Sequence, residues 1–270
     1  MTTMTQLEPA ATVRHRVSPA DAFGQTMTMA WRATMKMRRN PEQFFDVIVQ
    51  PLLVTAMFAY IFGGAISGNV ASYLPLLIPG ILAQTTLTAC IATGTQLRED
   101  MDKGVFERFK ALPIARIAPL AGPMVADLLR YTIATVLTFA TGFAMGYRPA
   151  GGVFGVLAAA LLTIATGWSL AWIFTFVGIK GKSAQAVQGM SMMIMFPLTF
   201  LSNAFVPEDT MPGWLQAFVQ LNPVSHVVSA VRDLANQGAV TAEVGWAVFA
   251  CVAVVAVFAP LSVRAYRRAM

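Results

Sequence analysis

Residues 153–179, VFGVLAAALLTIATGWSLAWIFTFVGI, contain no charged residue. A transmembrane helix needs about 20 mostly apolar residues, because the hydrocarbon core of a bilayer is roughly 30 Å thick. This stretch exceeds that length and is apolar on every side of a helix. The sequence therefore predicts that residues 153–179 cross a membrane.

Five more stretches have the same character, and four of them also lack charged residues. The six expected spans are residues 47–66, 74–97, 119–146, 153–179, 183–206 and 244–263. Of the 270 residues, 56% are hydrophobic and 12% are charged. The charged share is about half that of an ordinary soluble domain. The sequence predicts an all-α polytopic membrane protein with six transmembrane helices over residues 46–270, and it excludes a soluble globular domain.

The distribution of Lys and Arg predicts the orientation. Of the 19 such residues, 16 lie in the N-terminal tail, the loops after the second and fourth spans, and the C-terminal tail. On the opposite side there are only Arg148 and Arg232, and Arg130 lies inside the third span. Because these residues accumulate in cytoplasmic segments, both termini are expected in the cytoplasm. The net charge of +6 then reflects topology and contact with lipid headgroups, and no nucleic-acid partner is needed to explain it.

The segment before the first span predicts a tail followed by a helix. Residues 1–21 are expected to be a disordered cytoplasmic tail, and they contain no apolar core of a signal peptide. Residues 22–45 are expected to hold an amphipathic helix that lies flat in the cytoplasmic interface, and Asn40–Pro41 would end its regular part. Membrane anchoring and regulation are both open as its role. The apolar face of this helix is formed by Phe23, Met27 and Trp31. The opposite, basic face is formed by Arg32 and Lys36.

The cytoplasmic loop 98–116 predicts a second amphipathic helix. At helical spacing, Met101, Val105, Phe109 and Leu112 form one apolar stripe with charged residues of both signs beside it. An apolar stripe of this kind is typical of a docking surface for another protein. The alternative is a short helix that rests its stripe on the spans of the same chain or on lipid.

The external segment 207–243 predicts two short helices. Trp214 begins the apolar face of the first, and Asn222–Pro223 breaks the chain before the second. Neither helix is long enough to span a membrane, so we expect a re-entrant hairpin in the outer leaflet that is packed against protein. A pair of helices on the outer surface is the alternative. The candidate residues of this hairpin are Pro207, Pro212, Trp214, Asn222, Pro223, His226 and Arg232.

Two charged residues inside the third span need an explanation. Asp127 and Arg130 are three residues apart, so they share a helix face and can form an ion pair. Charged side chains in a span face the bundle interior or an aqueous cavity, because exposure to lipid is costly. A structural pair and a role in substrate passage or coupling both remain open. No spacing of acidic residues and histidines indicates a metal site or a catalytic cluster, which weighs against a membrane enzyme.

Together, these segments resemble the permease subunit of type 2 ABC exporters, and in particular its daunorubicin-resistance branch. The resemblance covers the chain from about Phe23 to the end. It is most specific in FVP at 205–207, MPGWLQ at 211–216 and LNPVSH at 221–226, followed by Arg232. In the cytoplasmic loop it is carried by RED at 98–100, ERF at 107–109 and LP at 112–113.

The resemblance implies partners that composition does not reveal. A separate P-loop ATPase subunit would bind ATP and Mg, a second permease copy would complete a homodimer, and this chain would hold no cofactor and catalyse no reaction. The interfacial helix would be the family's connecting helix beside the ATPase. The ATPase-coupling residues implied by the resemblance are Met101, Val105, Phe106, Glu107, Arg108, Phe109 and Leu112.

The expected function is that of a multi-pass permease in the bacterial plasma (inner) membrane. It would export a hydrophobic or amphiphilic compound, such as a drug or antibiotic, from the cytoplasm or inner leaflet. The substrate path would lie between two permeases, along spans one, two and five. Export of a lipid-linked polysaccharide or another lipid is an alternative within the family. A polytopic membrane enzyme is the alternative from another class.

Overall fold

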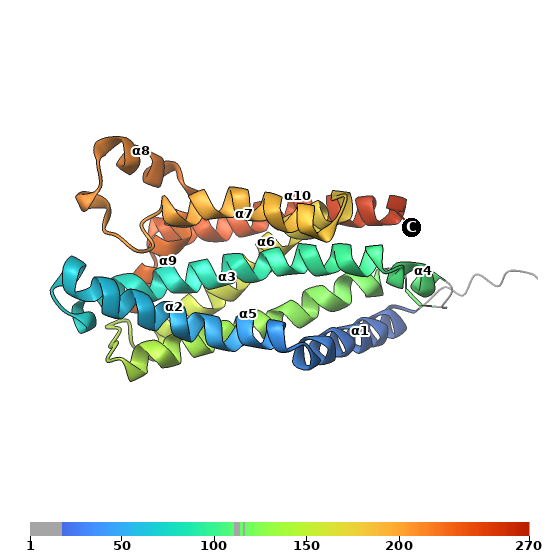
Figure 1. Cartoon of the computed structure of the whole chain (residues 1–270), viewed down its shortest axis with the longest axis horizontal. Coiled ribbons are helices and arrows are strands. Elements are labelled where there is room, and N and C mark those ends of the chain that lie inside the picture. Colours follow the sequence, from blue (N-terminus) through green and yellow to red (C-terminus); the bar gives the residue numbers. More distant parts are fainter. Residues whose placement is uncertain (1–17, 111–113, 116, 270) are drawn as a thin grey trace, which may run out of the picture.

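The apolar stretches form long helices that run side by side (Figure 1). The computed structural model describes residues 18–110, 114, 115 and 117–269. The helices are α1 (Pro19–Arg39), α2 (Pro41–Ser67), α3 (Val70–Asp102), α4 (Val105–Lys110), α5 (Ala118–Ala144), α6 (Gly152–Lys180), α7 (Ala184–Phe200), the 3-10 turn η1 (Glu208–Thr210), α8 (Gly213–Leu221), α9 (Pro223–Gln237) and α10 (Ala242–Ala269).

Five of these helices are long and apolar enough to cross a membrane, which confirms an all-α polytopic membrane fold. They are α2 from Val47, α3, α5, α6 and α10. The span expected at 183–206 corresponds to α7, which has 17 residues and ends at Phe200. That length is at the lower limit of about 17 residues for a transmembrane helix. The sixth span therefore stays a prediction.

The connections between the helices gather at two opposite ends of the bundle (Figure 1). The α2–α3 turn, the α5–α6 connection and α8 lie at one end, which we call the α8 end. The short helix α4 and the C-terminal end of α10 lie at the other, which we call the α4 end. The segments expected outside the cell and those expected in the cytoplasm thus fall at different ends, as alternating spans require.

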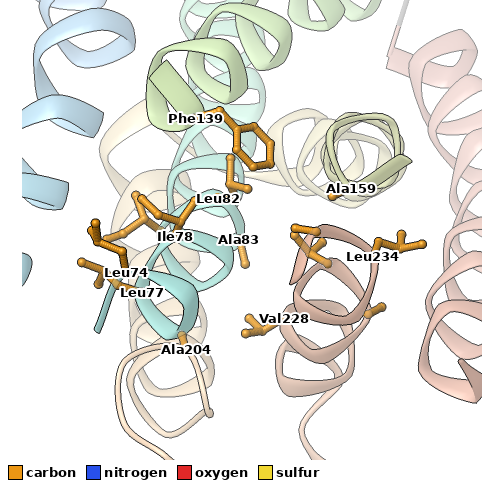
Figure 2. Close-up of a cluster of buried hydrophobic side chains, with 14 of the residues drawn as sticks. Leu74, Leu77, Ile78, Leu82, Ala83, Phe139, Ala159, Ala204, Val228 and Leu234 are labelled. Atoms are coloured by element: carbon orange, nitrogen blue, oxygen red, sulfur yellow. The ribbon is translucent and has the colours of Figure 1, made fainter. Parts of the chain in front are cut away.

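α3 occupies the centre of the bundle, where it contacts α2, α5, α6, α7 and α9. In its most apolar window 72% of residues are buried, against 6% in α10, so α10 is the helix whose apolar surface remains for lipid. Figure 2 shows Val228 and Leu234 of α9 in the same cluster of buried apolar side chains as Leu82 and Ala83 of α3. The second expected external helix is therefore part of the protein core.

α3 and α6 pack backbone against backbone at Gly94 and Gly178. A Cβ atom on Gly94 would lie 2.4 Å from the carbonyl oxygen of Phe174. A Cβ atom on Gly178 would lie 2.4 Å from the carbonyl oxygen of Gly94. Because no larger residue fits at these distances, the two glycines set how closely these helices approach.

Some helix bounds differ from the sequence predictions. α1 begins at Pro19, three residues before the predicted start, because Pro is well suited to a first helical turn. It ends at Arg39, and α2 begins at Pro41, earlier than the span predicted from residue 47. Residues 1–17 of the predicted tail lie outside the described residues.

Candidate functional site

At the α4 end, the predicted loop helix is broken in two. α3 continues into the loop as far as Asp102, and Gly104 then adopts a φ of 64° that favours glycine. The amide of Gly104 donates to the carbonyl of Met101 at 3.0 Å, which closes the end of α3. The turn separates α4 from α3, so Met101 of the predicted stripe lies on α3, whereas Val105 and Phe109 lie on α4.

The apolar stripe of this loop packs partly on the protein itself. Phe106 is buried and its ring meets Tyr266 of α10 edge to face at 5.4 Å. Met101, Val105 and Phe109 are half-buried, whereas Glu107 and Arg108 are exposed. Leu112 lies outside the described residues. The exposed surface of α4 is therefore mainly polar, and its apolar residues fix α4 to the bundle.

α1 contacts both α3 and α4 at this end of the bundle. Lys36 Nζ lies 2.7 Å from Asp100 Oδ1 of α3, and the guanidinium carbon of Arg32 lies 5.1 Å from the centre of the Phe109 ring. The basic face of α1 thus contacts α3 and α4. The apolar face carries Phe23, Met27 and Trp31, which are all exposed and therefore available to lipid.

The charged residues of the third span form a buried network between α5 and α3. Arg130 Nη1 lies 3.3 Å from Asp127 Oδ1, and both side chains are buried. The Thr93 hydroxyl donates to Asp127 Oδ2 at 2.7 Å, and Arg130 Nη2 donates to Gln96 Oε1 at 3.3 Å. The pairing expected from the sequence spacing is present, and the two α3 residues supply partners that the spacing could not indicate.

Two cavities border this network. One of about 50 Å³ is lined by residues of α1, α3, α4 and α5, including Phe109, Asp100, Asp127 and Arg130. A larger one of about 530 Å³ lies between α2, α3, α5 and α7, and Arg130 also lines it. The intramembrane charges therefore lie between the α1–α4 contact and a cavity large enough for part of a small molecule.

A third cavity of about 260 Å³ has a different character. It lies between α3, α6, α7, α9 and α10, and its wall is formed largely by apolar side chains such as Leu87, Met195 and Val254. The hydroxyls of Thr163 and Ser169 in this wall donate to carbonyls of their own helix. This cavity suits an apolar group.

At the α8 end, Asn222, which lies directly before α9, and Arg232 within α9 bind the irregular segment that follows α7. The amide nitrogen of Asn222 donates to the carbonyls of Leu198 at 2.7 Å and Leu201 at 2.9 Å. Arg232 Nη2 donates to the carbonyl of Asn203 at 2.8 Å. These bonds satisfy carbonyls that the end of α7 leaves without helical partners. Asn222 also ends α8 and caps α9, so the predicted break at Asn222–Pro223 is present.

α9 also supplies a hydrogen-bond donor that is missing within α3. Pro79 has no N–H, so the carbonyl of Pro75 four residues earlier lacks its helical donor. The amide nitrogen of Asn236 donates to that carbonyl at 2.8 Å, and the oxygen of the same amide accepts from the Tyr147 hydroxyl. Asn236 was not among the residues predicted from the sequence, although a proline inside an apolar span indicates that some donor must face the carbonyl four residues earlier.

The other hairpin residues are more peripheral. Trp214 of α8 is exposed. Pro207 and Pro212 directly precede η1 and α8, where proline is compatible with a helix start. His226 Nδ1 lies 2.7 Å from Glu243 Oε2 at the start of α10. Insertion of the hairpin into a leaflet stays a prediction. In the described ranges, no three His, Cys, Asp or Glu side chains gather in a way that could hold a metal ion.

Comparison with known proteins identifies the family. The family model for ABC-2 type transporters matches residues 24–235. The chain is 40% identical over 262 residues to the daunorubicin resistance ABC transporter permease protein DrrB1 of Streptomyces coeruleorubidus, covering 97% of this chain and 93% of that protein. It is 26% identical over 247 residues to the probable doxorubicin resistance permease protein DrrC of Mycobacterium tuberculosis, covering 91% and 89%. The chain therefore belongs to the ABC-2 type transporter family.

Proposed function

We propose that this chain is the membrane subunit of an ATP-driven exporter that moves a hydrophobic or amphiphilic compound, such as a drug, out of the cytoplasm or inner leaflet. The names of the daunorubicin and doxorubicin resistance relatives support this substrate class. A separate P-loop ATPase would bind ATP and Mg, and two copies of this chain would form the permease. The complex would lie in the bacterial inner membrane with both termini of the chain in the cytoplasm.

The observation that carries the proposal is the contact between α1 and α4. α4 is a short helix with an exposed polar face. Its Phe109 contacts Arg32 of α1, its Phe106 contacts Tyr266 of α10, and the helix also packs on α3. A force that a partner protein applies to Glu107 and Arg108 would therefore act on several spans at once. In this arrangement the apolar stripe, for which docking and packing on the spans were both open, would transmit the force, and the polar face would receive it.

The mechanism we infer is alternating closure. Binding of ATP would draw two ATPase subunits together and displace α4. The Arg32–Phe109 and Lys36–Asp100 contacts would carry that displacement to α1 and α3. Since α3 and Arg130 line the 530 Å³ cavity, movement of α3 would change its shape and move the bound compound outward.

The test is co-purification of the tagged chain from native membranes in mild detergent, followed by an ATPase assay. A vanadate-sensitive P-loop protein in the eluate supports the proposal, and a permease without ATPase activity contradicts it. Two variants then separate docking from transmission. Arg108→Glu is expected to reduce co-purification, whereas Phe109→Asp is expected to keep the ATPase bound but abolish export. Arg148→Glu at the opposite end, also exposed, is the matched control.

A further inference from the structure

The 260 Å³ cavity between α3, α6, α7, α9 and α10 opens on a surface that faces lipid. Ala250 of α10 lines the cavity and is itself exposed, which places the opening on the outward face of that helix. Around it, Trp246, Phe249 and Val252 are exposed as well. α10 packs on α6 and α9, whereas α7 packs mainly on α3, so α7 and α10 border the cavity without packing extensively on each other. The cavity is therefore continuous with the lipid-facing surface of α10.

The cavity lies at the depth of acyl chains. α10 begins at the α8 end with Ala242 and lines the cavity with residues between Ala247 and Val254 (Figure 1). At 1.5 Å per residue, these positions lie about 8 to 18 Å from the start of the helix. Each leaflet contributes about half of a hydrocarbon core that is roughly 30 Å thick, so this range falls mostly within the leaflet at the α8 end. The groups outside the opening are then acyl chains.

The wall of the cavity has few polar groups for a ligand. None of the described residues that line it is charged. The hydroxyls of Thr163 and Ser169 donate to carbonyls of their own helix, and Thr166 Oγ1 lies 3.5 Å from Cys251 Sγ. Buried water needs about two to four polar partners, so this wall binds water poorly. An apolar group that fills the cavity instead gains dispersion contacts on all sides.

The size of the cavity and the lack of polar groups favour a chain over a complete drug-sized compound. Pockets for drug-sized ligands usually have about 300–1,000 Å³ and a few polar groups that fix the orientation of the ligand. This cavity is smaller and has no such set of groups. An acyl chain is flexible, needs no polar partner and is abundant in the surrounding leaflet.

We propose that the cavity holds one acyl chain of a phospholipid from the leaflet at the α8 end, inserted beside Ala250 between α7 and α10. The chain supplies apolar contacts between α10 and the helices α3 and α7, on which α10 itself does not pack extensively. The headgroup stays at the interface, since the wall offers it no partner. This inference rests on the membrane fold and not on the proposed export.

The first experiment maps the contacts of a phosphatidylcholine that carries a photoactivatable diazirine in the middle of one acyl chain. The full-length permease is reconstituted in phosphatidylcholine vesicles that contain this probe, and cross-linked residues are identified by mass spectrometry. Cross-links are expected at Leu87 and Thr166, which line the cavity and are buried, in addition to the exposed Phe249 and Val252. Cross-links confined to exposed residues overturn the proposal.

A variant at the opening tests the entrance. Ala250→Trp is expected to reduce the cross-link at Leu87 severalfold, because the indole would occupy the space through which the chain enters. Ala256→Trp is the matched control, since Ala256 is also an exposed alanine of α10 but does not line the cavity. An undiminished cross-link at Leu87 in the folded Ala250→Trp variant overturns the proposal. The map of the unaltered protein needs no variant and decides the question if Ala250→Trp fails to fold.

A competitor separates a lipid chain from the exported compound as the occupant. Daunorubicin, the drug in the name of one relative, is expected to leave the cross-link at Leu87 unchanged. Loss of that cross-link while the one at Val252 persists would assign the cavity to the exported compound and overturn the proposal. The measurement needs no ATPase partner, so its result does not depend on whether the chain is part of an exporter.

Discussion

Replacement of Asn236 with Leu tests whether α9 repairs the gap that Pro79 leaves in α3. Leucine nearly preserves the volume of the side chain but has no N–H to offer the carbonyl of Pro75. A buried acceptor without a partner costs about 1–3 kcal/mol. Asn236 is only half-buried, so we expect a loss of about 1–2 kcal/mol, which for a chain of this size lowers Tm by roughly 2–8 °C.

A double-mutant cycle with Pro79→Ala makes the test specific. An alanine at position 79 restores the N–H that bonds to Pro75 within α3, so the cost of Asn236→Leu should fall by about 1 kcal/mol in that background. The bond from Tyr147 to Asn236 is lost in both backgrounds and cancels. Thermal unfolding of the four proteins in detergent, followed by tryptophan fluorescence, measures the difference. An equal loss in both backgrounds would show that Asn236 does not compensate for the N–H that Pro79 lacks.

Three further predictions follow from single contacts. Gly80→Ala is expected to destabilise the protein by about 1–3 kcal/mol in the same unfolding assay, because its Cβ would lie 2.0 Å from a carbonyl oxygen after α7. Gly64→Ala is the control, since its Cβ meets open space and the change should be neutral or stabilising. Lys36→Glu should reduce ATP-driven transport, and adding Asp100→Lys should restore much of it; no recovery in the double variant argues against the pair as a coupling contact. A small apolar maleimide should label Cys251, which is half-buried, and leave the fully buried cysteine of α3 unlabelled, as mass spectrometry of the two peptides would show.

The sequence predicts those parts of the fold that depend on local chemistry. The apolar length of a stretch predicts a membrane-crossing helix, because the bilayer sets that length. Breaks are predicted at Asn40–Pro41 and Asn222–Pro223, because the residue before proline avoids the helical conformation. The ion pair within α5 follows from a spacing of three residues.

The rest depends on contacts between helices. α7 ends at Phe200, short of the predicted span, and the side chain of Asn222, the cap of α9, binds two carbonyls there. No pattern in residues 201–206 shows which side chains bind these carbonyls. Likewise, Thr93 and Gln96 lie on the helix face that meets Asp127 and Arg130, but ordinary polar residues in a span do not reveal their partner. The spacing of three residues between Thr93 and Gln96, which matches that between Asp127 and Arg130, is the one indication in the sequence that the two pairs could meet.

The two ends of the bundle are held by different kinds of interaction, which indicates where motion begins. At the α8 end, uncharged amides and one half-buried arginine bind backbone carbonyls, and separation would leave these groups without hydrogen-bond partners. At the α4 end, the Lys36–Asp100 pair is partly exposed, and exposed pairs contribute only about 0–1 kcal/mol.

The ion pair between α1 and α3 at the α4 end is therefore less costly to break than the hydrogen bonds at the α8 end. We expect nucleotide-driven movement to start at α1 and α4, while α9 moves together with the part of α3 that it contacts. Hydrogen exchange of the complex with and without ATP would show this as a change in protection confined at first to α1, α4 and the end of α3. A change that begins in α9 would place the mobile element at the opposite end and contradict the argument.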